Sequence, residues 1–321
     1  MVMDRFDTGP GPRGVAVEGS TRAVVTALAA NLGIALSKFV AAVITGSSSM
    51  LAEAVHSVAD STNQALLLVG GRRSRRAPST EHPFGYGRTR YIYAFIVSIV
   101  LFTVGGVYAL YEGYQKIRHP HELSTPVVAI VVLVVAMILE GYALRTAAQT
   151  ANQTRGARSW WQFIRHAKSP EVPTILLEDT GAVTGLTLAL LGVGLTLVTG
   201  NGVFDALATV AIGVLLVAIA VVLAIETTSL LIGESATKED VDRIRQALME
   251  EPLFDRIIEL RTMHLGPDEI LVTAEVAIAG DDDGAEISAA IRDAERRIRM
   301  AVASARYVVI EPLLGHNVAS S

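Results

Sequence analysis

Six apolar stretches, each long enough to span a membrane, follow one another through most of the chain. They cover residues 22–45, 50–71, 91–115, 124–148, 171–198 and 203–232. Each exceeds the ~20 residues that an α-helix needs to cross ~30 Å of hydrocarbon. Buried core helices of a large soluble protein are the alternative, but six such stretches in close succession argue against it. The sequence therefore predicts an α-helical membrane protein with six transmembrane helices.

The composition agrees with this class and excludes several kinds of chemistry. Of the 321 residues, 51% are hydrophobic and only 18% are charged, whereas soluble domains carry about 25% charged residues. The chain has no cysteine. Disulfides, thiolate metal sites, Fe–S clusters and cysteine nucleophiles are therefore excluded.

Lysine and arginine residues set the expected orientation. The link between the second and third stretches carries six arginines, and the link between the fourth and fifth carries four more basic residues. The links on the other side hold few or none, so the basic links and both termini are expected on the cytosolic side of a cell membrane. Residues 1–21 are rich in glycine and proline and lack an apolar core, which predicts a disordered tail without a signal peptide.

The pattern changes after the sixth stretch. Over residues 236–316 it predicts helix, strand, strand, helix and strand, with the segment GPDE as a hairpin turn and Thr237 as a helix cap. This order predicts a cytosolic ferredoxin-like (α+β) αββαβ domain after a transport domain over 22–232. The last 88 residues hold 18 acidic and 10 basic side chains. A domain this small is expected to gain from pairing with a second copy.

Pairs of ionisable residues stand inside the second and fifth apolar stretches. His56 and Asp60 are four residues apart and share one helix face, while Glu178 and Asp179 are adjacent in the fifth stretch. Charges inside a membrane cost about 2.5–3.5 kcal/mol each and mark functional sites. An imidazole and a carboxylate at this spacing can bind one divalent cation. A purely structural polar pair, with His56 bonded to Asp60 or to Asn63, is the alternative.

These features together resemble the cation diffusion facilitator family of zinc, manganese and iron exporters. The segments GSSSMLAEAVHSVAD, HPFGYGRTR and FDALATVAIGVLL stand where that family has its signatures. The segments LLED and HLGPDEILVTAEV are closer still to the subgroup of the mitochondrial zinc exporter. The resemblance extends from about residue 22 to residue 314 and implies a homodimer.

The family's intramembrane tetrahedral site implies four ligands. His56 and Asp60 match the pair on the second span, and Asp179 matches one position on the fifth. The remaining position falls on Ile175, which cannot bind a metal. Glu178 is the expected substitute, although it points about 100° away from Asp179 on an ideal helix. A local distortion, a water molecule or Glu140 are alternatives, and Glu140 could instead pair with Arg145 near the cytosolic end.

Other family sites look incomplete. In the family's site after the second span, His82 matches one ligand. In the family's separate site in the soluble domain, Ile258 and Glu311 stand where histidines would be expected. His264 and His316 are expected to be ordinary surface residues. The family's charged link between the basic segment and the end of span six could form here between Arg88 and Glu234, or both charges could be solvated.

The expected function is export of a divalent cation, most consistent with zinc, by metal/proton antiport and alternating access. The metal and protons would be transported ions rather than cofactors, the bilayer and a second copy would be partners, and nucleic acid would not. The chain is not expected to be an enzyme, because it lacks the HExxH and GxSxG motifs. A passive cation channel and a non-transporting membrane scaffold or sensor are the alternatives.

Overall fold

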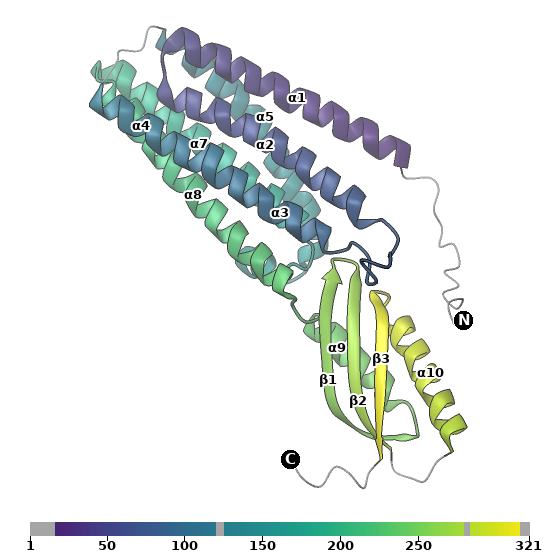
Figure 1. Ribbon diagram of the computed structural model, residues 1–321. Helices are drawn as coiled ribbons and strands as arrows, with labels where there is room; N and C mark the ends of the chain where they lie inside the picture. Colours follow the sequence, from purple (N-terminus) through teal and green to yellow (C-terminus); the bar gives the residue numbers. More distant parts are fainter. Residues whose placement is uncertain (1–16, 120–124, 279–282, 315–321) are drawn as a thin grey trace.

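A bundle of long helices continues into a small α+β domain (Figure 1). The computed structural model describes residues 17–119, 125–278 and 283–314. Residues 1–16 of the predicted N-terminal tail lie outside this range. The first helix, α1, begins at Val17, so the tail predicted for residues 1–21 is too long at its C-terminal end. Residues 17–21 continue the helix from Ala23 and Val24 without a proline or a glycine pair to stop it.

The bundle helices agree closely with the six apolar stretches. They are α1 (Val17–Thr45), α2 (Ser48–Ser74), α3 (Thr89–Val100) with η1 (Leu101–Val107) and α4 (Tyr108–Arg118), α5 (Pro126–Arg155), α7 (Glu171–Thr199) and α8 (Val203–Ile232).

Within the described residues, four helical segments are long and apolar enough to cross a membrane. They are Thr89–Arg118, Val127–Gln153, Glu171–Thr199 and Val203–Ile232. The described apolar part of α1 is shorter, Asn31–Thr45, and α2 carries the charged residues described below. The prediction of six spans therefore remains a prediction for α1 and α2.

The third predicted span is continuous but not uniform. Its central part, η1, is a π-helix (Leu101–Val107) that contains Gly105 and Gly106. At Gly106 a Cβ atom would lie 2.6 Å from a methyl group of Val217 in α8. The absence of a side chain there allows η1 and α8 to pack closely, which is common at helix interfaces in membranes.

A short helix, α6 (Trp160–His166), lies in the basic link between α5 and α7 and was not anticipated. Ser159 and Gln162 form a capping box: the Ser159 hydroxyl accepts from the Gln162 amide, and the Gln162 side chain accepts from the Ser159 amide. The segment SWWQ carries this signal in the sequence, because a serine followed three residues later by glutamine typifies a helix start.

The C-terminal domain has the predicted order of elements. It consists of α9 (Lys238–Met249), β1 (Phe254–Gly266), β2 (Glu269–Ile278), α10 (Gly284–Ala301) and β3 (Ala305–Leu314). The strands form one mixed sheet in the order β1-β2-β3, with β1 antiparallel and β3 parallel to β2. The turn between β1 and β2 falls at Pro267 and Asp268, as the segment GPDE predicts.

The core of this domain lies between the sheet and its two helices. Ile244 of α9 and Ile298 of α10 pack with Val272 and Val276 of β2, and all four are buried. Side chains of β2 alternate between buried and half-buried, which is the period of a sheet covered on one face. Both helices therefore cover the same face of the sheet.

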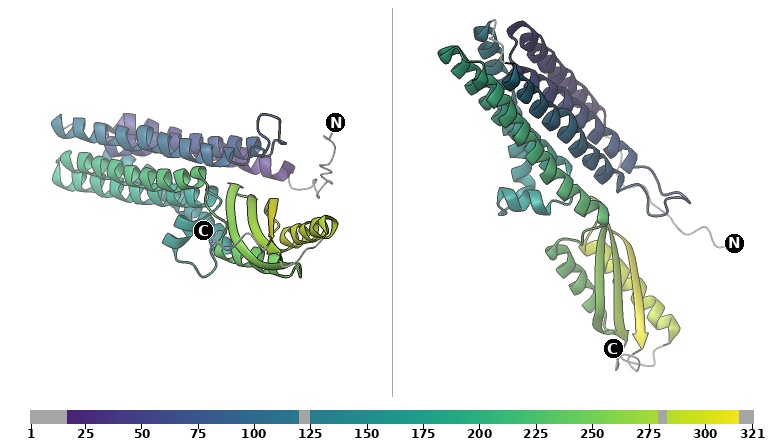
Figure 2. Two further views of the ribbon diagram at one scale, coloured as in Figure 1. Left: turned by 60° about the horizontal axis from the view of Figure 1, so that its bottom comes forward. Right: turned by 60° about the vertical axis from the view of Figure 1, so that its left-hand side comes forward.

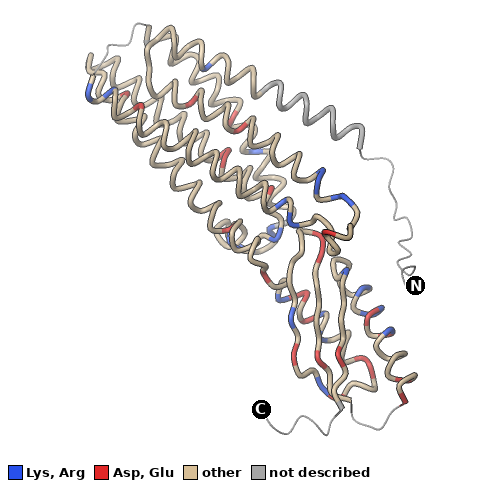
Figure 3. The backbone as a smooth tube through the Cα atoms, viewed as in Figure 1, with Lys and Arg blue, Asp and Glu red and all other residues tan. Residues whose placement is uncertain are grey.

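The basic links lie at the end of the bundle that meets the C-terminal domain. Figure 3 shows lysine and arginine residues gathered there, and the two views in Figure 2 show the domain beyond that end of the bundle. The α2–α3 link and the α5–α7 link thus lie on the same side, as their charge predicts.

Candidate metal centre

One face of α2 carries a row of polar side chains inside the bundle. Glu53, His56, Ser57 and Asn63 are buried, and Asp60 is nearly so. Their spacing of three and four residues places them on one side of the helix. This face is directed to α1 and α7, which both pack against α2.

His56 and Asp60 form the pair that the sequence predicts. The Nε2 atom of His56 lies 3.5 Å from the Oδ2 atom of Asp60. Among the described residues, neither ring nitrogen of His56 has a hydrogen-bond partner, nor has Oδ1 of Asp60. Leaving a buried polar atom unpaired costs about 1–3 kcal/mol. An imidazole and a carboxylate in this state fit a divalent cation.

The two acidic residues of α7 have different surroundings. Glu178 is buried, and its Oε1 atom accepts a hydrogen bond of 2.7 Å from the side-chain amide of Asn63. Asp179 is only half-buried. Both are close enough for their charges to act on Asp60. Asn63 thus binds Glu178 of α7, so of the two partners that the structural alternative offers His56, only Asp60 lies beside it.

The side chains do not converge on one point. Within the described parts of the chain, no group of three or more histidine, aspartate or glutamate side chains is placed to hold a metal ion. His56 and Asp60 are brought together, while Glu178 and Asp179 lie within electrostatic range of them on α7. Ile175 is half-buried on the same helix. The four predicted ligands are therefore neighbours, but not a preformed tetrahedron.

A buried lysine completes the charged region and was missed. Lys38 of α1 is fully buried, with its Nζ atom 2.7 Å from the Ser57 hydroxyl and 3.4 Å from Oε2 of Glu53. It is also 3.6 Å from Oε1 of Glu140 in α5. Lys38 is the one charged residue between residues 31 and 45, and this isolation in an apolar stretch was the signal that could have identified it.

Glu140 therefore belongs to this charged region. It pairs with Lys38, and its charge acts on Glu53, Asp60 and Asp179. The alternative pairing of Glu140 with Arg145 is not formed within the described residues, where the ion-pair partner of Glu140 is Lys38.

A glycine of α7 makes room for the Glu53 carboxylate. A Cβ atom placed on Gly185 would collide with Oε1 of Glu53. The same Oε1 atom lacks a hydrogen-bond partner among the residues described. Glu53 thus lies directly against α7, and a side chain at position 185 would require either Glu53 or α7 to move.

A second polar cluster lies at the opposite end of the bundle from the C-terminal domain. Asp205, in the first turn of α8, accepts hydrogen bonds from the Ser47 hydroxyl at 2.8 Å and from the Ser48 amide at 2.8 Å. The hydroxyls of Ser48 and Ser49 also donate to it. Ser47 in turn caps α2 by accepting from the Met50 amide. The segments GSSS and FDA therefore act together to join α2 to α8.

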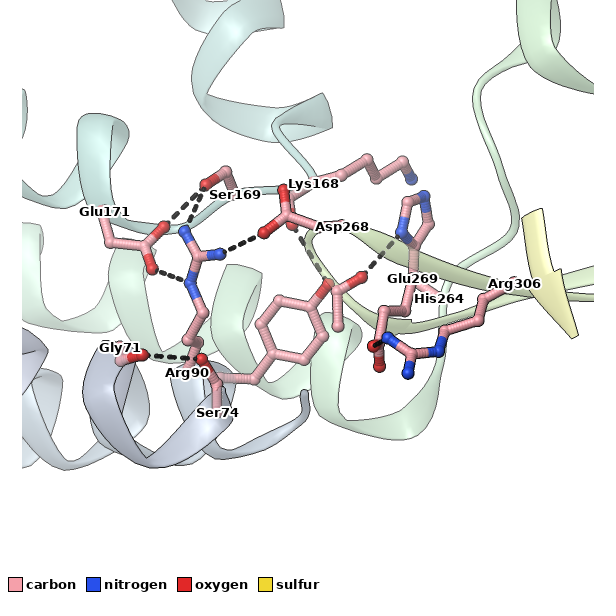
Figure 4. Close-up of polar contacts among 12 residues, drawn as sticks. Gly71, Ser74, Arg90, Lys168, Ser169, Glu171, His264, Asp268, Glu269 and Arg306 are labelled. Carbon is pink, nitrogen blue, oxygen red and sulfur yellow. Dashed lines mark hydrogen bonds and ion pairs between the residues drawn. The ribbon is translucent and has the colours of Figure 1, made fainter. Parts of the chain in front are cut away.

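The junction with the C-terminal domain is built from ion pairs (Figure 4). Arg90 of α3 binds Glu171 of α7, and it binds Asp268 of the β1–β2 turn at 2.8 Å. Lys168, in the α6–α7 link, lies 2.6 Å from Glu234. Burial alone would raise the pKa of Glu234, but hydrogen bonds from Lys168 and Ser229 and the charge of Lys168 lower it below its usual value.

Two expectations for this junction are wrong. Glu234 is held by Lys168 and not by Arg88, whose guanidinium contacts the sulfur of Met263 at 3.3 Å. His264 is not a surface residue: it is buried, with Nδ1 3.1 Å from the Gly266 carbonyl. Burial lowers the pKa of its imidazole. The α6–α7 link brings Lys168 to Glu234 and close enough to His264 for its charge to act there, and local sequence does not reveal such contacts between distant segments. His316 lies outside the described residues.

Four described helices are long and apolar enough to cross a membrane, and charged side chains are grouped inside the bundle, which defines the class as an α-helical membrane protein. The chain belongs to the cation efflux family, whose transmembrane domain matches residues 24–232. The predicted resemblance is confirmed. Relatives of this family are transporters, so the prediction that the chain is not an enzyme is also confirmed.

Curated relatives agree with the predicted subgroup. The chain is 32% identical to the mouse protein named proton-coupled zinc antiporter SLC30A9, mitochondrial, over 278 residues, which is 85% of this chain and 49% of the relative. The human protein of the same name is 32% identical over 265 residues, covering 82% and 47%. Metal tolerance protein C4 of Arabidopsis thaliana is 30% identical over 265 residues, covering 81% and 58%. The chain spans about half the length of these relatives.

The predicted location is contradicted by these relatives. The sequence was taken to indicate a cell membrane, but the SLC30A9 proteins are named as mitochondrial. Charge in the links distinguishes the two sides of a membrane and carries no information about which membrane it is. The prediction of several membrane passes is unaffected.

Proposed function

We propose that the protein transports a divalent metal cation, zinc, across a membrane in exchange for protons. The observation that carries this proposal is the His56–Asp60 pair, which is buried in the bundle and in which neither imidazole nitrogen has a hydrogen-bond partner among the described residues. Family membership supports metal transport, and the names of the SLC30A9 relatives support zinc and protons. Those names also point to a mitochondrial membrane.

In this proposal His56 and Asp60 supply the first two ligands from α2, and Asp179 and Glu178 supply carboxylates from α7. Zinc accepts imidazole and carboxylate ligands in a tetrahedral arrangement. Binding would displace protons from these groups, since a metal ligand must be deprotonated. The ligands come from two helices, so a change in the packing of α7 against α2 would both assemble and dismantle the site.

Alternating access is the transport mechanism that we propose, because the charged groups of the site differ in their exposure. Lys38 and Glu53 are fully buried, whereas Asp60 and Asp179 retain some exposure. We infer that the site opens first to the side of the C-terminal domain, where the cation enters, and that rearrangement of the helices then exposes it to the other side. The six spans over 22–232, the αββαβ domain over 236–316 and homodimerisation are parts of this proposal.

The test is zinc-dependent proton movement in proteoliposomes that hold the purified protein. Wild type is compared with Asp179→Asn, Glu178→Gln and, as a matched control outside the bundle, Asp255→Asn. We expect zinc uptake coupled to counter-movement of protons in wild type and the control, and a loss of at least tenfold in Asp179→Asn. The Glu178→Gln variant shows whether that carboxylate is a ligand.

Each alternative gives a different result. Zinc movement without any change in pH would favour a passive channel. Absence of zinc movement, with transport of manganese or iron, would keep the family and reject zinc. Absence of transport of any of these cations by a folded protein would reject the proposal in favour of a scaffold or sensor.

A further inference from the structure

The Lys38 ammonium is enclosed by three helices. It projects from α1, which packs against α2 and α5, and it is fully buried. Its partners are Ser57, Glu53 and Glu140. Burying an ammonium group is costly unless it is paired. Its retention among apolar neighbours needs a reason beyond helix packing, since an apolar side chain of similar length would also fill the space.

Lys38 is not committed to one carboxylate. The distances from Nζ are 3.4 Å to Glu53 and 3.6 Å to Glu140, whereas the short contact of 2.7 Å is to the neutral hydroxyl of Ser57. A strong charge-assisted pair has a nitrogen–oxygen distance of about 2.7–2.9 Å. The ammonium thus lies between two acids, close to both and tightly bound to neither.

Glu140 is shared between Lys38 and the candidate metal centre. Its charge acts on Asp60 and Asp179 as well as on Glu53. It comes from α5, which packs against both α1 and α7. A divalent cation beside Asp60 and the ammonium of Lys38 would therefore both be attracted to the Glu140 carboxylate.

We propose that Lys38 is a tethered cation that competes with the transported metal for Glu140 and thereby weakens metal binding and promotes release. This inference rests on the proposed function. Two cations near one carboxylate repel each other, and in a site shielded from water the repulsion is poorly screened. A transporter must release its ion, so an affinity that is too high would slow turnover. A lysine on α1 supplies the opposing charge without an additional ion.

The proposal predicts a distinct pattern of metal affinity and transport rate, because the effect depends on the charge of Lys38 and not on the shape of its side chain. Removing the charge should tighten metal binding while slowing transport, so that KM and kcat fall together. Retaining the charge should retain both values. A residue that only packs helices would instead lower activity and stability in all variants, whatever their charge.

The experiment measures Zn²⁺ binding by titration of the purified full chain and Zn²⁺ transport in proteoliposomes. The neutral variants are Lys38→Met and Lys38→Gln, of which the second keeps hydrogen-bonding capacity should the first fail to fold. Lys38→Arg keeps the charge. Lys116→Met is the matched control, since Lys116 is also buried but is not paired with Glu53 or Glu140. Its Nζ atom lies 2.6 Å from the Gly46 carbonyl oxygen.

We expect both neutral variants to bind Zn²⁺ at least tenfold more tightly than wild type and to turn over at least fivefold more slowly. Lys38→Arg should stay within about threefold of wild type in affinity, and Lys116→Met should keep wild-type affinity. Wild-type affinity in the neutral variants would overturn the inference. So would failure of both neutral variants to fold, or an equal loss in Lys38→Arg, because Lys38 would then be structural. Wild type that neither binds nor transports Zn²⁺ would instead overturn the proposed function.

Discussion

The Nε2 atom of His56 lies 3.5 Å from Oδ2 of Asp60 one helical turn away, and within the described structure His56 makes no hydrogen bond through its ring. A histidine retained for packing would be expected to donate at least one hydrogen bond when buried. This relationship therefore favours a ligand role for His56 over a structural one, and it can be tested directly.

Replacement of His56 by alanine should abolish Zn²⁺ transport without unfolding the protein. The substitution removes a ligand and breaks no hydrogen bond in the described structure, but it leaves a cavity where the buried imidazole lies, so the thermal midpoint should fall while the protein stays folded. Transport is measured in proteoliposomes, with His166→Ala as control because His166 is exposed on α6. Unfolding of His56→Ala, with normal stability of the control, would instead show a structural histidine.

A second prediction concerns the contact of Gly185 with Glu53. Gly185→Ala adds a methyl group where the Glu53 carboxylate lies, so α7 and α2 must separate or Glu53 must move. Overpacking of this kind costs about 1–3 kcal/mol. Gly194→Ala on the same helix is the matched control, since nothing lies within 4 Å of the added atom, and alanine is the better helix former by about 1 kcal/mol.

The measurement is the thermal midpoint of both variants in detergent. We expect a decrease for Gly185→Ala, and no change or a small increase for Gly194→Ala. Equal behaviour of the two variants would show that the Glu53 side chain does not depend on the gap at Gly185.

The sequence predicted what depends on local spacing. His56 and Asp60 were paired correctly because four residues make one helical turn whatever surrounds the helix, and the turn at Pro267 and Asp268 follows from its own residue types. Most ends of the bundle helices were found to within about three residues because the apolar stretches stop where links begin, but α1 starts earlier and α5 ends later than its apolar stretch. Each of these features is determined within a few residues of chain.

Contacts between distant segments were not predictable. Lys38 meets Glu140 across 102 positions of sequence only because α1 and α5 pack together. Glu234 pairs with Lys168, and not with Arg88, because of the path that the chain takes after α6. His264 looked exposed because β1 was considered alone, without the bundle beside it.

Asp205 should be essential for stability. It accepts hydrogen bonds from the Ser47 and Ser48 hydroxyls and from the Ser48 amide, and its charge strengthens each of them. Asp205→Asn retains the shape, removes the charge and turns one acceptor into a donor. Hydrogen bonds to charged groups contribute about 1.5–3 kcal/mol each, so a loss of about 2–4 kcal/mol is expected.

Thermal or chemical denaturation in detergent measures this loss. Asp255→Asn serves as the control because Asp255 is exposed and should change stability by less than about 0.5 kcal/mol. If Asp205→Asn were as stable as the control, the serine cluster would not join α2 to α8 in solution.

His264 should make stability depend on pH. Burial lowers the pKa of His264 from its usual value of 6.5, so the folded state keeps the ring neutral at pH values where the unfolded chain binds a proton. Stability contributed in this way is present above pH ~6.5 and is lost as the pH falls below it. Protonation would also place a second positive charge near Lys168, while Glu234 and Asp240 partly offset it.

The midpoint of unfolding should therefore fall between pH 7.5 and pH 5, and His264→Gln should reduce the slope. His166→Gln, at an exposed histidine, is the control and should keep the wild-type slope. An unchanged slope in His264→Gln would assign the pH dependence to other groups.

The last prediction concerns which basic residue holds Glu234 at the junction. Lys168 Nζ lies 2.6 Å from Oε2 of Glu234, and both side chains are about four-fifths buried. A pair of this kind should show a coupling of about 1 kcal/mol in a double-mutant cycle of Lys168→Ala and Glu234→Ala. The parallel cycle with Arg88→Ala should show almost none, since Arg88 contacts Met263.

Because the lowered pKa of Glu234 reflects Lys168, the coupling between Lys168 and Glu234 is full above pH ~4.5 and disappears as the pH falls through the folded-state pKa of Glu234. Coupling to Arg88 instead of Lys168 would mean that the link after α6 follows a different path in solution and that the family's charged link forms as the sequence first indicated.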